Sequence, residues 1–284
     1  MAGRAGPLLV IDGDSFAHRS YHALPKSIRR NDGRPAGAIL GFANFLIKLY
    51  LEEAPGAVLV GWDTLEAPNK RQLAFPAYQS GRVFDDELIE QLALLPRFVT
   101  ACGFANAKAQ GYEADDFLAA AAAREEKRGR KVLIASGDRD AFQLASELTT
   151  ILYPIKAGET ARIGPAQVQE RYGVEPRQVP DFIALRGDAS DRIPGAKGVG
   201  PTTAASLLRK YGSLENALRE GRFAGQAEEL RLYRRIAAMD AAAPLPKALR
   251  QGFRPQEASA LARQWGLMQL AERLARLQTS QNKS

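Results

Sequence analysis

The chain has 284 residues, of which 45% are hydrophobic and 25% are charged, and its formal net charge is +7. This length allows one large domain or two smaller ones with a substantial core. A single cysteine, Cys102, excludes an internal disulfide and is typical of a reducing compartment. The first apolar run, Leu8–Ile11, is too short for a signal peptide or a membrane span. We therefore expect a cytoplasmic protein with no membrane partner.

Three short apolar runs are each followed by an aspartate. They are residues 8–11 before Asp12, residues 58–62 before Asp63, and residues 132–136 before Asp138. Such runs, alternating with helical segments, predict buried parallel strands of an α/β fold, and a further strand is expected at Thr149–Tyr153. Ligands of parallel sheets bind just beyond the carboxyl ends of the strands. The sequence therefore predicts that three strands direct an acid toward one edge of the sheet.

Helical periodicity follows these strands in the first two thirds of the chain. It predicts helices at about 36–52, 85–102 and 113–128, and a short one from Asp138 to Leu144. Between residues 64 and 82, basic and aromatic residues alternate without a clear period. A long segment with so few core residues is typical of a functional loop or lid.

After Pro180 the sequence has no strong strand pattern. It predicts helices at about 181–186 and 201–211, separated by a turn-rich loop over 194–200, and helical structure from 213 to about 278. The second part of the chain is therefore expected to be helical.

Nine acids fall at strand ends, in first turns of helices or in one turn-rich loop. They are Asp12, Asp63, Glu113, Asp115, Asp116, Asp138, Asp140, Asp188 and Asp191. Taken singly, each group could be an acidic first turn, a helix cap or a simple turn. Brought together, they would repel unless a cation neutralised them. Oxygen ligands without Cys or His favour Mg²⁺ or Mn²⁺, and a zinc motif is absent because no Glu follows His18.

The remaining charge is strongly basic. Setting the nine acids aside leaves 23 acids against 39 Lys and Arg, a balance of +16. A basic exterior around an acidic centre suits a polyanionic substrate, although the same charge could serve solubility alone. The glycine-rich turn at 195–200 lacks a P-loop motif, but it could hold a DNA phosphate or, through its carbonyls, a monovalent cation. It could equally be a tight link between two helices.

Several motifs in combination resemble the 5′-nuclease family, which includes flap endonucleases and the 5′→3′ exonuclease domain of bacterial DNA polymerase I. They are Ile11-Asp12-Gly13, Trp62-Asp63, Gly111–Asp116, Ser136–Asp140, and Gly187–Asp191 with Ile193–Gly195 and Gly198–Gly200. The resemblance covers roughly residues 8 to 214 and suggests a standalone module without a polymerase. It implies a PIN-like, mainly parallel twisted sheet flanked by helices, and a helix–three-turn–helix module that binds DNA.

The resemblance also implies domain boundaries and site residues. The catalytic domain would span 1–178, with an arch at about 64–95, and the DNA-binding module with the C-terminal helices would span 179–284. Two Mg²⁺ ions, for which Mn²⁺ could substitute, would be held by two sets of carboxylates: Asp12, Asp63, Glu113, Asp115 and Asp116 for the first, and Asp138, Asp140, Asp188 and Asp191 for the second. Asp115 would bridge the two ions.

Further roles follow from the same resemblance. Arg71, Tyr78 and Arg82 would assist catalysis together with Asp115. DNA would be contacted by Lys70, Arg71, Arg82, Lys197, Gly198, Gly200, Thr202 and Thr203, and K⁺ would be held at Val199 and Gly200. The chain departs from the family at Gln79 and Thr202, where lysine is usual.

The expected function is therefore a structure-specific 5′-nuclease that hydrolyses DNA flaps, 5′ overhangs or nicked ends by two-metal-ion catalysis. We expect a monomer near the bacterial nucleoid, with a DNA polymerase acting in trans. Two alternatives remain open. Gln79 and Thr202 favour a flap-binding relative that cleaves weakly or not at all, and a PIN-type ribonuclease would share the core but has no need of a duplex-binding extension.

Overall fold

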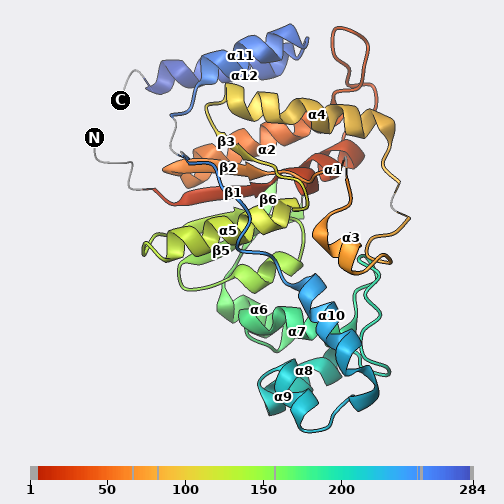
Figure 1. Ribbon diagram of the computed structural model, residues 1–284. Helices are drawn as coiled ribbons and strands as arrows, with labels where there is room; N and C mark the ends of the chain where they lie inside the picture. Colours follow the sequence, from red (N-terminus) through yellow and green to blue (C-terminus); the bar gives the residue numbers. More distant parts are fainter. Residues whose placement is uncertain are drawn as a thin grey trace.

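A computed structural model describes residues 6–65, 67–81, 83–156, 158–247, 249 and 252–281. Its central element is a six-stranded sheet of order β3-β2-β1-β4-β5-β6 (Figure 1). The strands are β1 Leu8–Asp12, β2 Ala57–Gly61, β3 Ala105–Ala107, β4 Val132–Ala135, β5 Thr149–Lys156 and β6 Glu159–Ile163. Every neighbouring pair is parallel except β5 and β6, which form an antiparallel hairpin. The predicted mainly parallel α/β fold is confirmed.

Two of these strands were not predicted from the sequence. β3 has the sequence Ala-Asn-Ala, which carries no apolar run, and β6 lies at the edge of the sheet with most of its residues partly exposed. A strand this short or this exposed is held by its hydrogen bonds to a neighbour, so its own residues carry a weak signal.

Helices cover both faces of the sheet (Figure 1). The helices of the first part of the chain are α1 Gly13–Ala23, α2 Gly37–Glu53, α3 Lys70–Ala74, α4 Asp86–Ala101, α5 Ala114–Glu126 and α6 Pro165–Tyr172. Alternate residues of β1 enter different cores: Leu9 and Ile11 pack with α2 and α4, whereas Leu8 and Val10 pack with α5. Strands buried on both faces explain the continuous apolar runs of the sequence. Helices α1, α3 and α6 were not predicted.

The last third of the chain is helical, as expected, but it is not one continuous run of helices. The elements are α7 Val179–Arg186, α8 Pro201–Tyr211, α9 Leu214–Arg219, α10 Ala227–Ala237, α11 Pro255–Gln264 and α12 Met268–Gln281. After α10, non-helical residues among 238–254 carry the chain back along the molecule (Figure 1). α11 and α12 then pack beside α4 in the core that also contains α2, away from α8 and α9. The segment 179–284 therefore packs in two places: α7 to α10 lie against the core under α5, and α11 and α12 lie against α4.

No helix in the described part of the chain is long and apolar enough to cross a membrane. The helices α7 to α10 pack mainly on one another and on the core under α5. They present the loop between α7 and α8 next to the carboxyl ends of the strands.

One buried acid, Asp181, ties α7, α9 and α10 together. One carboxylate oxygen accepts the N–H of Leu214 at the start of α9 (2.9 Å), and the other pairs with Arg234 of α10. Removing Asp181 leaves the buried N–H of Leu214 without a partner, whereas Arg234 is half exposed and remains solvated. We expect Asp181→Ala to lower the free energy of unfolding by about 2 kcal/mol in urea denaturation. Asp181→Asn, which keeps an acceptor for Leu214, should lose less, and equal losses would contradict this assignment.

Candidate active site

A cleft of about 780 Å³ opens at the carboxyl ends of β1, β2 and β4. The carboxylates that line it include eight of the nine predicted acids: Asp12, Asp63, Glu113, Asp115, Asp138, Asp140, Asp188 and Asp191. Asp116, the ninth, lies behind the wall of the cleft, where it contacts Arg71 and the backbone N–H of Asp240. The acids come from segments spread over residues 12 to 191. The three strand-end acids, Asp12, Asp63 and Asp138, lie in the same cleft, as their pattern predicted.

Asp12 is held rigidly at the end of the central strand. Its carboxylate accepts the backbone N–H of Ser15 (3.0 Å), which caps α1, and the hydroxyl of Ser136 (2.8 Å). Burial raises the pKa of Asp12 to about 7 from its usual 3.8, and the neighbouring charge of Asp63 adds to the shift. On the next strand, Asp63 accepts the N–H of Ala114 (2.7 Å) and thereby fixes the start of α5.

A further carboxylate, Asp14, also lines the cleft, and it was not predicted from the sequence. It is buried, and its Oδ2 accepts the backbone N–H of Asp63 (2.8 Å). Burial, followed by the charge of Asp63, raises the pKa of Asp14 well above its usual value. Its place two residues after the strand-end Asp12, in the first turn of α1, was the signal that could have identified it.

The first turn of α5 contributes Glu113, Asp115 and Asp116. The backbone N–H of Glu113 donates to Asp116 (3.1 Å), which closes the helix start. Burial raises the pKa of Glu113 to about 7, although the positive charge of Arg71 acts against this shift. Burial also raises the pKa of Asp115 well above its usual value. Oδ1 of Asp115 is buried and has no hydrogen-bond partner.

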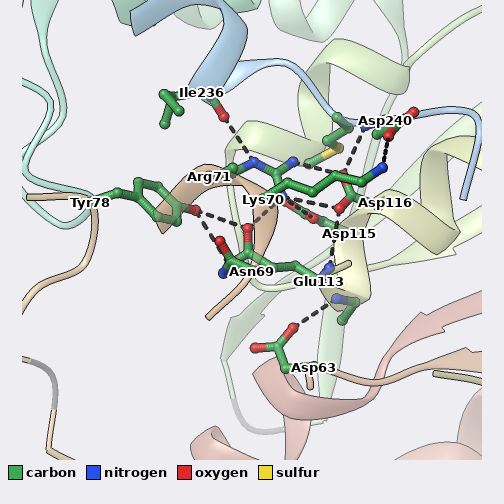
Figure 2. A network of polar contacts seen from close by, with 12 residues as sticks. Asp63, Asn69, Lys70, Arg71, Tyr78, Glu113, Asp115, Asp116, Ile236 and Asp240 are labelled. Atoms are coloured by element: carbon green, nitrogen blue, oxygen red, sulfur yellow. Dashed lines mark hydrogen bonds and ion pairs between the residues drawn. The ribbon is translucent and has the colours of Figure 1, made fainter. Parts of the chain in front are cut away.

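Arg71 from α3 lies against these three acids (Figure 2). Its guanidinium donates to Glu113 and to Asp116 (2.7 and 3.1 Å) and lies 3.6 Å from Asp115. Its other N–H groups donate to the backbone carbonyls of Ile236 (2.9 Å) and Ala238 (3.2 Å). The side chain is buried, so in this conformation Arg71 neutralises the acids and does not face solvent. A direct contact with DNA, as predicted for Arg71, would require it to leave this network.

The second predicted set lies across the cleft, on two loops. Asp138 Oδ1 accepts the N–H of Asp140 (2.9 Å), and burial, followed by the charge of Asp138, raises the pKa of Asp140 well above its usual value. The pKa of Asp188 is lowered, because hydrogen bonds from Ser190 outweigh the effect of burial. Asp191 is buried at the end of the same loop.

Two glycines close the loop that carries Asp188 and Asp191. Gly187 and Gly195 both have a positive φ (80° and 77°), and a Cβ at Gly195 would lie 2.4 Å from the backbone nitrogen of Gly187. No other residue type fits this approach. The glycines predicted to mark a turn therefore also hold two candidate metal ligands in place.

The donor set fits hard divalent cations. Within the described residues, no three acidic, histidine or cysteine side chains already form a geometry that fits one ion, and Arg71 occupies the space among three of the acids. The chemistry nevertheless matches: the acids are oxygen donors, one carboxylate oxygen of Asp115 is buried and accepts no hydrogen bond although Arg71 lies 3.6 Å away, and several of the carboxylates have raised pKa values. Such a site gains stability from a bound cation.

This electrostatic state predicts a pH dependence of stability. For Asp12 and Glu113 the pKa in the folded protein, about 7, exceeds the usual values of 3.8 and 4.5, so their stabilising effect is present below about pH 4 and is lost as the pH rises through about 7. We expect the Tm of the protein in EDTA to fall by roughly 5 °C between about pH 5 and pH 8. Mg²⁺ should raise the Tm more at the higher pH, because it competes with protons for the same carboxylates. Thermal melts at both pH values test this, and a Tm in EDTA that rises with pH would contradict it.

The arch segment lies beside the cleft. The side chain of Asn69 caps α3 by accepting the backbone N–H of Gln72 (2.8 Å). In return, the side-chain oxygen of Gln72 accepts the backbone N–H of Asn69 (3.0 Å). Lys70 pairs with Asp240 (2.9 Å) and lies over the ring of Tyr112, and its side chain is half exposed. Tyr78 is buried and reaches Glu113, as Figure 2 shows. Arg82, predicted as a catalytic and DNA-binding residue, lies outside the described residues.

The predicted DNA-backbone turn lies between α7 and α8. Lys197, Gly198, Gly200, Thr202 and Thr203 are exposed, and Val199 is partly exposed. Gly198 has a φ of 76°, and a Cβ at Gly198 or Gly200 would meet no atom within 4 Å. Gly200 precedes α8 without any side-chain cap, so the N–H groups of the first turn face open space. This geometry fits a backbone that another molecule approaches closely.

Comparison with known proteins identifies the family. The profile described as "5'-3' exonuclease, N-terminal resolvase-like domain" matches residues 7–173, and the one described as "5'-3' exonuclease, C-terminal SAM fold" matches residues 174–280. The thermostable DNA polymerase I of Thermus thermophilus is 38% identical over 88% of this chain and 31% of its own length. DNA polymerase I of Mycobacterium tuberculosis is 41% identical over 75% of this chain and 24% of its own length. The chain thus spans about a third or less of these relatives.

Solved structures agree on the fold. The T5 5′-exonuclease with bound zinc has a TM-score of 0.68 at 17% identity, covering 95% of this chain and 98% of that chain. The catalytic core of Rad2 in complex with DNA substrate has a TM-score of 0.61 at 12% identity, covering 95% and 90%. The two 5′-3′ exonuclease profiles match consecutive parts of the chain, and together they span residues 7–280. This protein therefore belongs to the 5′-3′ exonuclease family.

Proposed function

We propose that this protein is a Mg²⁺-dependent, structure-specific 5′-nuclease that hydrolyses DNA at 5′ flaps, 5′ overhangs or nicks. The observation that carries the proposal is the cleft itself: acids from three strand ends, one helix start and one loop gather beside an arch segment. Proteins seldom bury so many carboxylates together unless cations neutralise them.

We assign the carboxylates to two ions, as the family resemblance implies. The first would be held by Asp12, Asp63, Glu113, Asp115 and Asp116, and the second by Asp138, Asp140, Asp188 and Asp191. Asp115, whose buried Oδ1 accepts no hydrogen bond and lies 3.6 Å from Arg71, is the candidate bridge. Asp116 would reach the first ion only if Arg71, which now bonds to it, gave way. When bound, two such ions supply a hydroxide nucleophile and stabilise the leaving oxygen of a phosphodiester; Mn²⁺ could replace Mg²⁺.

The chain's own groups would position the DNA. Lys197, Gly198, Gly200, Thr202 and Thr203 offer N–H groups, hydroxyls and one ammonium to a duplex backbone. The carbonyls at Val199 and Gly200 could hold K⁺ in the same turn. Lys70, Arg71 and Arg82 of the arch would contact the 5′ strand, with Arg71, Arg82 and Tyr78 assisting near the reacting phosphate. For Arg71 this role requires exchange of its carboxylate partners for DNA.

The proposed setting follows from the relatives. Because DNA polymerase I of Thermus thermophilus contains a matching region, a DNA polymerase is a fitting partner. We propose a monomer that acts in the bacterial cytoplasm near the nucleoid.

A labelled 5′-flap DNA tests the proposal directly. Wild-type protein should cleave the flap with Mg²⁺ and not with EDTA, and should leave a 5′-phosphate and a 3′-hydroxyl. A matched RNA strand serves as the second substrate. No metal-dependent cleavage of the flap would reject the nuclease assignment, and preference for the RNA strand would favour the ribonuclease.

A weakly cleaving relative is the second candidate, and one observation favours it. The family resemblance leads us to expect lysine where this chain has Gln79, and the amide of Gln79 is bonded to Asp191 and Tyr78. Binding of the flap with slow cleavage at saturating Mg²⁺ would support this alternative.

A further inference from the structure

The arch and the loop that carries Asp191 meet at Gln79. The backbone N–H of Gln79 donates to the carbonyl oxygen of Asp191 (3.3 Å), and its side-chain Nε2 donates to Asp191 Oδ1 (2.9 Å). Beside this pair, Arg192 Nη1 donates to the hydroxyl of Ser80 (2.9 Å). Three hydrogen bonds therefore join segments that lie 112 residues apart in the sequence.

The second hydrogen of the Gln79 amide extends the contact to the other side of the cleft. Nε2 also donates to the hydroxyl of Tyr78 (2.8 Å), and that hydroxyl lies 3.3 Å from Glu113 Oε2. The hydroxyl of Tyr78 therefore accepts a hydrogen bond from Gln79 and donates one to Glu113. The Gln79 amide is thus the donor at the start of two paths: it donates directly to Asp191, and it donates to Tyr78, which in turn donates to Glu113.

The backbone on both sides of this contact adopts an unfavourable conformation. Gln79 has a φ of 50° and Arg192 a φ of 57°, the left-handed region that non-glycine residues rarely occupy. Such conformations persist where the surrounding contacts hold them, and they concentrate at functional sites. The strain is therefore consistent with a contact that has a function.

Gln79 also lies between two cavities. It lines the carboxylate cleft and a second cavity of about 370 Å³ beside the arch, which is lined by Thr64, Leu65 and Asn69. Asp63 and Glu113 line both as well. A side chain at this position is placed to act on the carboxylates from the arch.

We propose that Gln79 is a positioning residue that orients one carboxylate from each metal set, Asp191 directly and Glu113 through Tyr78. The inference deepens the proposed nuclease function and rests on it. Hydrogen-bonded groups around a ligand fix its orientation and tune its affinity for the metal. An amide can do this without adding a positive charge, whereas an ammonium at the same place would compete with the cation for Asp191.

Titration with Mn²⁺ alone, followed by calorimetry and by electron paramagnetic resonance of free Mn²⁺, tests the proposal on the full chain. Gln79→Met keeps the length of the side chain but has no donor. We expect it to weaken both Mn²⁺ sites, the site of the Asp191 set by about tenfold and the site of the Glu113 set by less, because the contact with Glu113 runs through Tyr78. Gln79→Gly, which relieves the positive φ and so favours folding, should weaken the same two sites. Ser80→Ala is the matched control: it removes the neighbouring bond from Arg192 but touches neither carboxylate, and its Mn²⁺ binding should equal that of the wild type.

The outcomes separate this inference from the proposed function. Weakened Mn²⁺ binding in both Gln79 variants, with Ser80→Ala unchanged, supports the positioning role even if the wild type fails to cut a flap. That last result would reject only the nuclease assignment. Unchanged binding in both Gln79 variants overturns the positioning role while leaving the nuclease intact. Equal weakening in Gln79→Met, Gln79→Gly and Ser80→Ala also overturns the positioning role, because any disturbance of the contact between the arch and the Asp191 loop would then weaken Mn²⁺ binding. A wild type that binds no Mn²⁺ overturns both.

Discussion

Asp115→Ala should abolish flap cleavage while leaving flap binding largely intact. Asp115 lines the acidic cleft, and its buried Oδ1 has no hydrogen-bond partner in the described structure. As the proposed bridge between two ions, it would contribute several kcal/mol of transition-state stabilisation, so we expect the single-turnover rate to fall by about 10³-fold or more. Quench-flow cleavage of a 5′-flap with Mg²⁺ measures the rate, and fluorescence anisotropy with Ca²⁺ measures binding.

The stability of this variant distinguishes a lost ligand from a damaged fold. Burial and like charges already oppose ionisation of Asp115, so its removal should leave the Tm in EDTA unchanged or higher. Asp86→Ala is a matched control, since Asp86 is also an acid in the first turn of a helix but is exposed and does not line the cleft. Cleavage by Asp115→Ala at the normal rate would show that the bridging role is wrong.

Arg71→Met should destabilise the metal-free protein strongly. The guanidinium donates to Glu113 and Asp116, lies 3.6 Å from Asp115, and is itself buried. Removing one partner from a buried ionic network leaves charges uncompensated, at a cost of roughly 3–5 kcal/mol. Urea denaturation in EDTA measures this loss. With Mg²⁺ present the loss should shrink, because cations can take over the neutralisation of the acids.

Arg139→Met is the matched control for Arg71→Met. Arg139 also lines the cleft but is exposed, with its Nε bonded to the hydroxyl of Tyr153 (3.3 Å). It should change stability little in either buffer. If Arg71→Met kept full stability yet lost cleavage, the side chain would act mainly on DNA, as the family resemblance predicts, and the neutralising role would be rejected.

The sequence determined the framework of the site. Short apolar runs ending in acids predicted parallel strands that meet at one edge, and Asp12, Asp63 and Asp138 do line one cleft. These patterns are local, because burial on both faces of a strand imposes a continuous apolar run. The helical C-terminal part and the turn at 195–200 were also predicted from local patterns. Helical periodicity and glycines in turns can both be recognised within a few residues of sequence.

Other features could only come from the tertiary structure. Nothing in the residues around Arg71 shows that its guanidinium lies among Glu113, Asp115 and Asp116, and nothing near Gln79 shows that its amide meets Asp191. The return of α11 and α12 to the face of α4 was also not predicted. Each depends on contacts between distant segments. A side chain's sequence neighbours set its helix or strand, whereas its charge partner is set by which surfaces the whole chain buries against one another.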